Sequence, residues 1–166
     1  MNYSMLNDFN DQQKTEVIAL LTPKVGPVVD GVKTKYKLHG RKFSKRDFFR
    51  ICAAEKINLA NDEAFRFMVP FDQIHGAYMT MKDDVKAIYL RSFFEPSLDN
   101  ADDMATACHE LGHHFLHQKS PGSQFAIDRV HLKFSERVEK YGRHEVNAQE
   151  IKEVEADLFA QLLLTI

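Results

Sequence analysis

Residues 104–118, MATACHELGHHFLHQ, place His109, Glu110 and His113 in the spacing H-E-x-x-H. Side chains four residues apart project from consecutive turns of a helix, so the two imidazoles can reach one ion at about 2.0–2.1 Å. Glu110 is rotated far enough to miss the ion and to contact its water instead. The spacing therefore predicts a zinc site in which His109 and His113 are ligands and Glu110 is the catalytic carboxylate.

The helix predicted around this motif has an apolar side and a histidine side. At about 100° per residue, four apolar residues fall within one narrow arc: Met104, Cys108, Leu111 and Phe115. His109 and His113 lie on a different side, which argues against core histidines but leaves a merely solvated polar face as an alternative. His114 is expected at the surface, and His117 is expected either to support the site or to be solvated.

A third ligand is needed to decide between a metal site and a polar face. The metzincin extension requires a glycine seven and a histidine ten residues after the first histidine, but Leu116 and Lys119 occupy those positions. That class is excluded, and the remaining option is a glutamate from a later helix.

The last predicted helix, residues 147–164, offers three glutamates: Glu150, Glu153 and Glu155. On a helical wheel Glu155 falls inside the apolar stripe, whereas Glu153 points to the opposite side. A carboxylate within an apolar stripe is costly unless it is paired or bound to a metal. The wheel therefore favours Glu155 as the third ligand, with a buried salt bridge to Lys or Arg as the alternative.

The other elements that must position these residues follow from caps, turns and periodicity. A helix over 12–21 is expected to end at Pro23, and the segment from there to Leu38 fits a helix or a strand. Ser44 and Asp47 resemble a capping box that starts a helix reaching residue 56. A short strand at 57–59, a hairpin of 74–81 with 86–94, and a helix beginning at 99 or 100 follow. The expected fold class is α+β, with one small antiparallel sheet and helices around it.

Composition sets the limits within which these elements assemble. The chain has 166 residues, of which 44% are hydrophobic and 28% charged, as in a globular protein of one domain. Neither a signal peptide nor a membrane-length apolar run is present, so a cytoplasmic protein without membrane association is expected. The two cysteines, Cys52 and Cys108, match no C-x-x-C pattern, which leaves His and carboxylate as metal ligands; Cys108 is expected to fill space.

A basic run covers residues 33–46, where seven of fourteen residues are Lys or Arg and none is acidic. Such a run can attract nucleic acid, but it is more often a solvated connection. The sequence pI near 6.4 and the lack of a DNA-binding motif argue against direct nucleic-acid binding.

The two segments ACHELGHHFLH and EVEADLFAQLLL together resemble the ImmA/IrrE family of metallopeptidases, whose members show an H-E-L-G-H helix and a later E-A-(N/D)-x-F-A-x-x-L-L helix. The resemblance implies a single zincin-like domain over 1–166, with a helical, basic extension at 1–43 and a catalytic core at 44–166. It implies that His109, His113 and Glu155 bind zinc (Zn2+) and that Glu110 is catalytic. It also implies an intracellular enzyme, often carried by mobile elements, that acts on a helix-turn-helix repressor. Cys108 and the long stretch 118–150 depart from the family pattern, and the latter leaves the substrate open.

Three classes of function follow from these observations. The first is a zinc endopeptidase with a specific protein substrate, such as a DNA-binding repressor. The second is a metal-containing module that sequesters a regulator without cleaving it, and the third is a nucleic-acid-binding protein. Glu110 favours the first class, because a pure binder needs no general base. The donor that stabilises an oxyanion remains open among five residues: Tyr78, Tyr89, His131, Tyr141 and His144.

Overall fold

The computed structural model describes residues 10–60, 76–80, 82–90, 101–117, 126–127 and 148–166. Its helices are α1 (Asp11–Lys35), α2 (Lys45–Ala54), the short 3-10 helix η3 (Lys82–Asp84), α4 (Ala101–His117) and α6 (Ala148–Leu164). Its strands are β1 (Ile57–Ala60), β2 (Gly76–Thr80), β3 (Lys86–Leu90) and β4 (Ala126–Ile127). The expected α+β class is confirmed. Among these helices, none combines the length and apolar character that crossing a bilayer requires.

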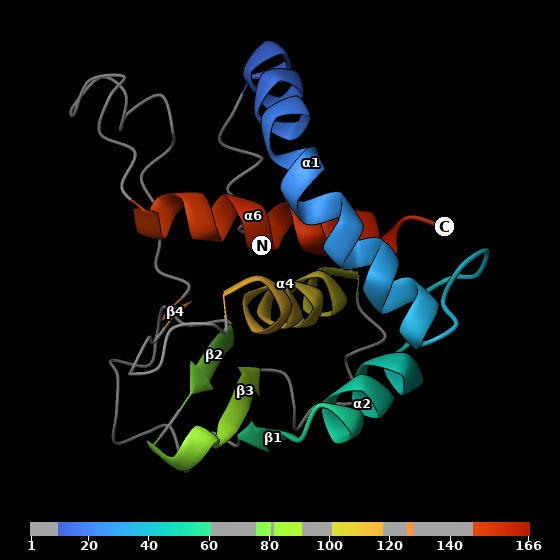
Figure 1. Cartoon of the computed structure of the whole chain (residues 1–166), viewed down its shortest axis with the longest axis vertical. Coiled ribbons are helices and arrows are strands. Elements are labelled where there is room, and N and C mark those ends of the chain that lie inside the picture. Colours follow the sequence, from blue (N-terminus) through green and yellow to red (C-terminus); the bar gives the residue numbers. More distant parts are fainter. Residues whose placement is uncertain (1–9, 61–75, 81, 91–100, 118–125, 128–147) are drawn as a thin grey trace.

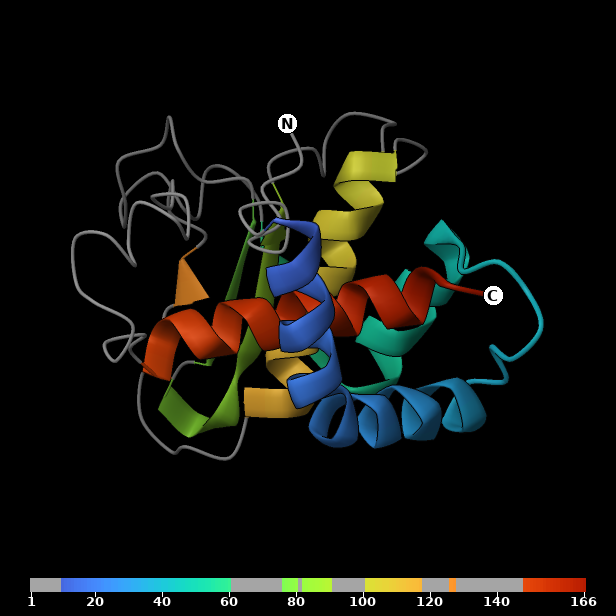
Figure 2. The same ribbon diagram turned by 90° about the horizontal axis from the view of Figure 1, so that it is seen from above.

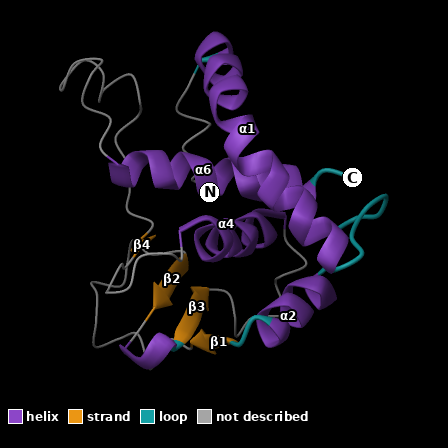
Figure 3. Ribbon diagram, viewed as in Figure 1, coloured by secondary structure: helices purple, strands orange, loops and turns teal. Residues whose placement is uncertain are grey.

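Helix α4 lies at the centre of the fold, between the sheet and α6 (Figure 1). Helix α6 crosses over α4, and α1 in turn runs across α6, as the view from above confirms (Figure 2). Helices therefore form successive layers on one face of the sheet (Figure 3). One apolar core connects these layers and includes Val25 of α1, Phe48 of α2, Ile88 of β3, Leu111 of α4 and Phe159 of α6. Residues from both sides of position 43 thus share one core.

The sheet is mixed, so the expectation of a purely antiparallel sheet is wrong. Its strand order is β1-β3-β2-β4, with β1 parallel to β3 and the remaining neighbours antiparallel. A tight turn fixes the direction of β3 relative to β2. Strand β1 pairs with β3, which does not follow it directly in the chain, so no local signal in the sequence specified how β1 pairs. Strand β4 also pairs with Ala77 and Tyr78, so β2 is not an edge strand at these two residues.

The predicted hairpin is confirmed by the antiparallel pairing of β2 with β3, in which Gly76 lies opposite Leu90 and Thr80 opposite Lys86. Asp83 and Asp84 in the connection have φ values of 68° and 58°. Aspartate adopts this left-handed conformation more readily than most residues, because its short side chain can bond to nearby backbone. Asp83 and Asp84 therefore make the turn of the predicted hairpin.

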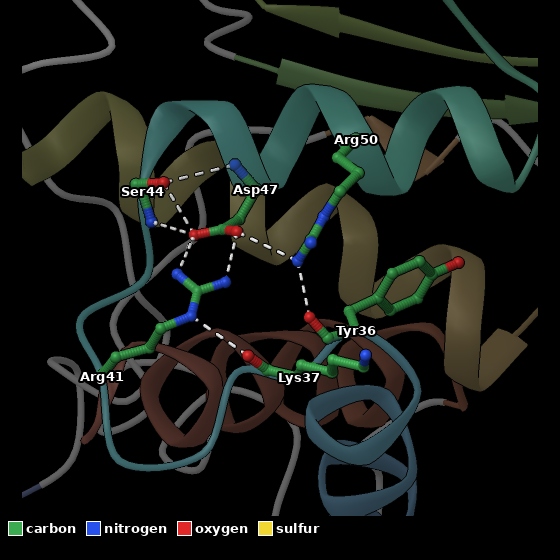
Figure 4. Close-up of polar contacts among 6 residues, drawn as sticks. All are labelled: Tyr36, Lys37, Arg41, Ser44, Asp47 and Arg50. Atoms are coloured by element: carbon green, nitrogen blue, oxygen red, sulfur yellow. Dashed lines mark hydrogen bonds and ion pairs between the residues drawn. The ribbon is translucent and has the colours of Figure 1, made fainter.

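The capping box that begins α2 is also confirmed. The Ser44 hydroxyl accepts a hydrogen bond from the Asp47 amide, and the Asp47 carboxylate accepts one from the Ser44 amide at 3.0 Å. The Arg41 guanidinium binds both oxygens of the same carboxylate, at 2.7 and 2.6 Å, and Arg50 adds a contact at 3.2 Å (Figure 4). The hydrogen bonds from Arg41 outweigh the effect of burial and hold the pKa of Asp47 well below its usual range.

Among the basic side chains of the run 33–46, Lys33, Lys35 and Arg41 have structural partners. Besides Arg41, Lys33 donates a hydrogen bond to the carbonyl of Thr165 at 2.6 Å, and Lys35 donates one to Glu55 at 2.5 Å. These contacts join the end of α1 to α6 and α2. Some of the charged side chains of this run therefore form contacts that hold α1, α2 and the end of α6 together.

Helix α1 continues through Pro23 and Pro27, so the predicted end at Pro23 is wrong. A proline inside a helix removes a backbone hydrogen bond and usually kinks the helix. Figure 2 shows that α1 bends part way along its length. The helix continues beyond the bend because three valines and a tyrosine at helical spacing are buried against the core: Val25, Val29, Val32 and Tyr36. Tertiary packing thus outweighs the local preference.

Candidate metal centre

The H-E-x-x-H residues lie in the second half of α4 and are buried. His109 is 4% exposed, His113 2% and Glu110 0%. The helix predicted around the motif is confirmed as α4. Its residues Leu111 and Cys108 face the core, as expected. The alternative interpretation, in which the two histidines lie on a solvated polar face, is wrong. Helix α6 covers the side of α4 that carries them.

Gly112 is what lets α6 come so close. A Cβ atom at this position would lie 3.0 Å from Cα and 3.1 Å from the carbonyl oxygen of Ala156, and 3.2 Å from Cβ of Phe159. Such distances are shorter than ordinary van der Waals contacts, so a side chain here would push the two helices apart. The small residues Gly112 and Ala156 therefore form the crossing point, and this brings the first half of α6 against the histidine pair.

Three side chains converge at this crossing: His109 and His113 from α4, and Glu153 from α6. The two Nε2 atoms are 3.1 Å apart, and the Glu153 carboxylate lies 3.1 Å from His109 Nε2 and 3.4 Å from His113 Nε2. Ligand atoms placed tetrahedrally at 2.0–2.1 Å from a zinc ion are separated by about 3.3–3.4 Å. The two imidazole nitrogens lie close to this separation, and each faces one oxygen of Glu153, Oε2 at His109 and Oε1 at His113. Nitrogen and carboxylate donors grouped in this way suit a divalent metal.

Glu155, the predicted third ligand, does not belong to this group, and the glutamate that lies in it is Glu153. The Glu155 carboxylate contacts Lys24 Nζ at 2.6 Å and His117 Nε2 at 2.9 Å. Glu155 is thus buried and forms a salt bridge, as the alternative expected, although its partner Lys24 is mostly exposed. A helical wheel could not separate the two glutamates, because every residue from Glu153 to Ala160 is buried and this stretch of α6 has no solvent side.

Asp157 holds His109 from the side away from the candidate metal position. Its Oδ1 atom lies 2.7 Å from His109 Nδ1 and is buried. Since a carboxylate accepts hydrogen bonds, His109 Nδ1 carries the proton and Nε2 presents its lone pair to the cluster. Partners of this kind fix the orientation of metal-binding imidazoles.

Glu110 lies beside the amino end of β2. A Cβ atom at Gly76 would lie 2.8 Å from Glu110 Oε1 and 2.8 Å from Cγ2 of Thr106. Glycine at position 76 is thus required for the strand to pass so close to the carboxylate. The backbone of β2 and the general base predicted from the sequence are neighbours.

His114 is buried at 1% exposure, so its expected surface position is wrong. Its Nδ1 lies 3.1 Å from the Tyr78 hydroxyl and its Nε2 3.2 Å from the Glu55 carboxylate. The reason is that the sheet and α2 pack on the side of α4 opposite α6. Burial lowers the pKa of His114, although the hydrogen bond to Glu55 opposes the shift.

The predicted oxyanion donors fall into two groups. Tyr78 directs its hydroxyl to His114, and Tyr89 packs with Ala77, Met79 and Ala87 on the other face of the sheet. His131, Tyr141 and His144 lie outside the described residues, as do the side chain of Glu150 and most of the stretch 118–150.

Sequence reasoning missed Glu153, Asp157 and Lys24. A usable signal existed for the first two, since residues 153 and 157 are four apart and share one helix face, so one can contact the ion while the other supports a ligand. No such signal existed for Lys24, which is 131 residues away from its partner Glu155.

Comparison with known proteins identifies no relative: no family model, curated protein or solved structure matches this chain. The donor set of the described residues therefore carries the functional argument. His109, His113 and Glu153 can hold a metal ion, and Glu110 follows directly on the first histidine of α4.

Proposed function

We propose that this chain is an intracellular zinc-dependent endopeptidase. The observation that carries the proposal is the convergence of three buried side chains, His109, His113 and Glu153, which could hold a metal ion. Glu110, the residue after His109 on α4, is buried as well. Two histidines and one carboxylate form the ligand set of zinc peptidases, in which a fourth position remains for water or substrate.

His109, His113 and Glu153 would hold the zinc ion, which would supply Lewis-acid chemistry to a peptide carbonyl and to water. Glu110 then has two roles in the chain's own chemistry. Its carboxylate accepts the proton of the attacking water and delivers it to the nitrogen of the departing amine. The bond that breaks is the peptide C–N bond, and no covalent bond to the protein is needed.

The proposed substrate is a protein, specifically a helix-turn-helix repressor or a similar regulatory partner. Support for this substrate class comes from the resemblance of ACHELGHHFLH and EVEADLFAQLLL to the ImmA/IrrE family. The alternative is a metal-containing module that sequesters the regulator intact, and burial of the whole donor set favours this second candidate.

Glu110→Gln separates the two functions. The change preserves side-chain size and the three metal ligands but removes the proton acceptor, and general acid–base catalysis typically contributes about 10²–10⁴-fold. Each variant is co-expressed with a candidate helix-turn-helix repressor, and the repressor is followed by intact-mass spectrometry.

The peptidase proposal expects the repressor to be cleaved by the wild type and to stay intact with Glu110→Gln. Glu16→Gln, on the exposed surface of α1, is the matched control and should cleave like the wild type. Relief of repression by all three proteins with an uncut repressor would establish sequestration instead.

A further inference from the structure

A hydrogen-bonded chain of side chains leads from the surface of α1 to the candidate metal centre. Lys24 Nζ lies 2.6 Å from Glu155 Oε1, and Glu155 Oε2 lies 2.9 Å from His117 Nε2. His117 Nδ1 is in turn 3.0 Å from His113 Nδ1. Lys24 is 61% exposed at its side chain, whereas Glu155 is 2% exposed and His117 9%. The chain thus connects solvent with a buried ligand through α1, α6 and α4.

When His117 is neutral, the donors and acceptors of this chain allow one arrangement. The Glu155 carboxylate accepts hydrogen bonds, so the proton between it and His117 belongs to His117 Nε2. A neutral His117 then has an unprotonated Nδ1, which can only accept. The proton shared with His113 must therefore sit on His113 Nδ1, and His113 Nε2 is left with a lone pair.

His109 is also left with a lone pair on Nε2, because its Nδ1 donates a hydrogen bond to the Asp157 carboxylate. Both Nε2 lone pairs therefore face each other across 3.1 Å, with the Glu153 carboxylate beside them. Two lone pairs and an anion repel one another unless a cation lies between them. The two chains prepare both histidines in the form that binds metal.

We propose that Lys24, Glu155 and His117 are positioning residues, which hold His113 in its Nδ1-protonated form and aim its Nε2 at the metal. The proposal deepens the proposed function and rests on its metal centre. It also gives Glu155 a role: this residue supports a ligand through His117 and is not itself a ligand. Lys24 binds one carboxylate oxygen and leaves the other for His117.

The first test measures the affinity for zinc alone, by competition with a chelating dye, using purified metal-free protein. His117→Phe, Glu155→Gln and Lys24→Met are compared with the wild type. Loss of a hydrogen-bond partner behind a ligand typically weakens metal binding about 10–100-fold. Larger losses are expected for His117→Phe and Glu155→Gln than for Lys24→Met, because Lys24 acts through two intervening residues.

Matched controls are available on the exposed surface. Glu16→Gln and His39→Gln change the same residue types away from the chain and should leave zinc affinity unchanged. Lys24→Arg should restore affinity relative to Lys24→Met, since Arg also donates to a carboxylate. Circular dichroism of the metal-free variants establishes that they fold, and Lys24→Met keeps the test decisive because its side chain lies mostly in solvent.

The second test reads the tautomer directly. In the metal-free wild type, the ¹⁵N shifts of His113 should show a protonated Nδ1 and an unprotonated Nε2. In His117→Phe they should show a mixture of both tautomers, which a purely structural role of His117 does not produce.

The outcomes separate this inference from the proposed function. Zinc affinities and His113 shifts unchanged in His117→Phe and Glu155→Gln overturn the positioning role while leaving the metal centre in place. A wild type that binds no zinc overturns both. Weakened zinc binding with the expected tautomer change supports the inference even if the wild type cleaves no repressor.

Discussion

Gly112→Ala tests whether the crossing of α4 and α6 assembles the metal centre. The new Cβ would approach Ala156 Cα to 3.0 Å, its carbonyl oxygen to 3.1 Å and Phe159 Cβ to 3.2 Å. Two of these atoms are backbone, so relief requires α6 to move by about a few tenths of an ångström and not merely a side-chain rotation. Glu153 and Asp157, three residues before and one residue after Ala156, would move with it.

The size of the effect follows from two opposing terms. Replacing glycine by alanine inside a helix stabilises it by about 1 kcal/mol. Overpacking a well-filled contact costs about 1–3 kcal/mol. The net change therefore lies between about zero and a destabilisation of about 2 kcal/mol. Zinc affinity should fall by about 10-fold or more, because displacing Glu153 and Asp157 weakens one ligand and the support of another.

Gly31→Ala is the matched control, since a Cβ there meets nothing within 4 Å on the exposed side of α1. Gly31→Ala gains the stability of alanine over glycine in a helix without the clash. The free energies of unfolding of the two variants should therefore differ by about 1–3 kcal/mol, which corresponds to about 2–4 °C in Tm per kcal/mol. Thermal unfolding of the metal-free proteins and zinc titration supply both quantities. Equal stability and equal zinc affinity of Gly112→Ala and Gly31→Ala would refute the proposed crossing.

Three further predictions concern the ligand, an ion pair and the thiols. Glu153→Ala should purify without the zinc that the wild type retains, as metal analysis by mass spectrometry will show; full zinc content would disprove its role as a ligand. The lowered pKa of Asp47 means that the Arg41 pair stabilises the fold above the unfolded-state pKa of about 4, and that this stability is lost as pH falls from there toward the folded-state pKa. Urea unfolding of metal-free protein between pH 5 and 3 should therefore show a weaker pH dependence for Asp47→Asn, and equal slopes would contradict it. Burial raises the pKa of Cys52 to about 12 and that of Cys108 still further, so both thiols should react with iodoacetamide only after denaturation; rapid labelling of the native protein would show that they are accessible.

Local signals in the sequence determined much of the framework. The capping box at Ser44, the Asp-Asp turn and the helical periodicity around His109 each act within a few residues, and the structure contains all three elements. The expected end of α1 at Pro23 failed because buried valines further along the helix hold it in place. A local rule predicts well only where no distant contact opposes it.

The candidate site divides in the same way. The spacing of His109 and His113 follows from helix geometry alone, since residues four apart lie on one face whatever surrounds them. The choice between Glu153 and Glu155 depends on which face of α6 meets α4 at Gly112, and on Lys24 of α1 binding Glu155 from the other side. A helical wheel gives the angle between two residues of one helix but not the neighbour that each one faces. Only the tertiary structure supplies those neighbours, because they come from segments far apart in the chain.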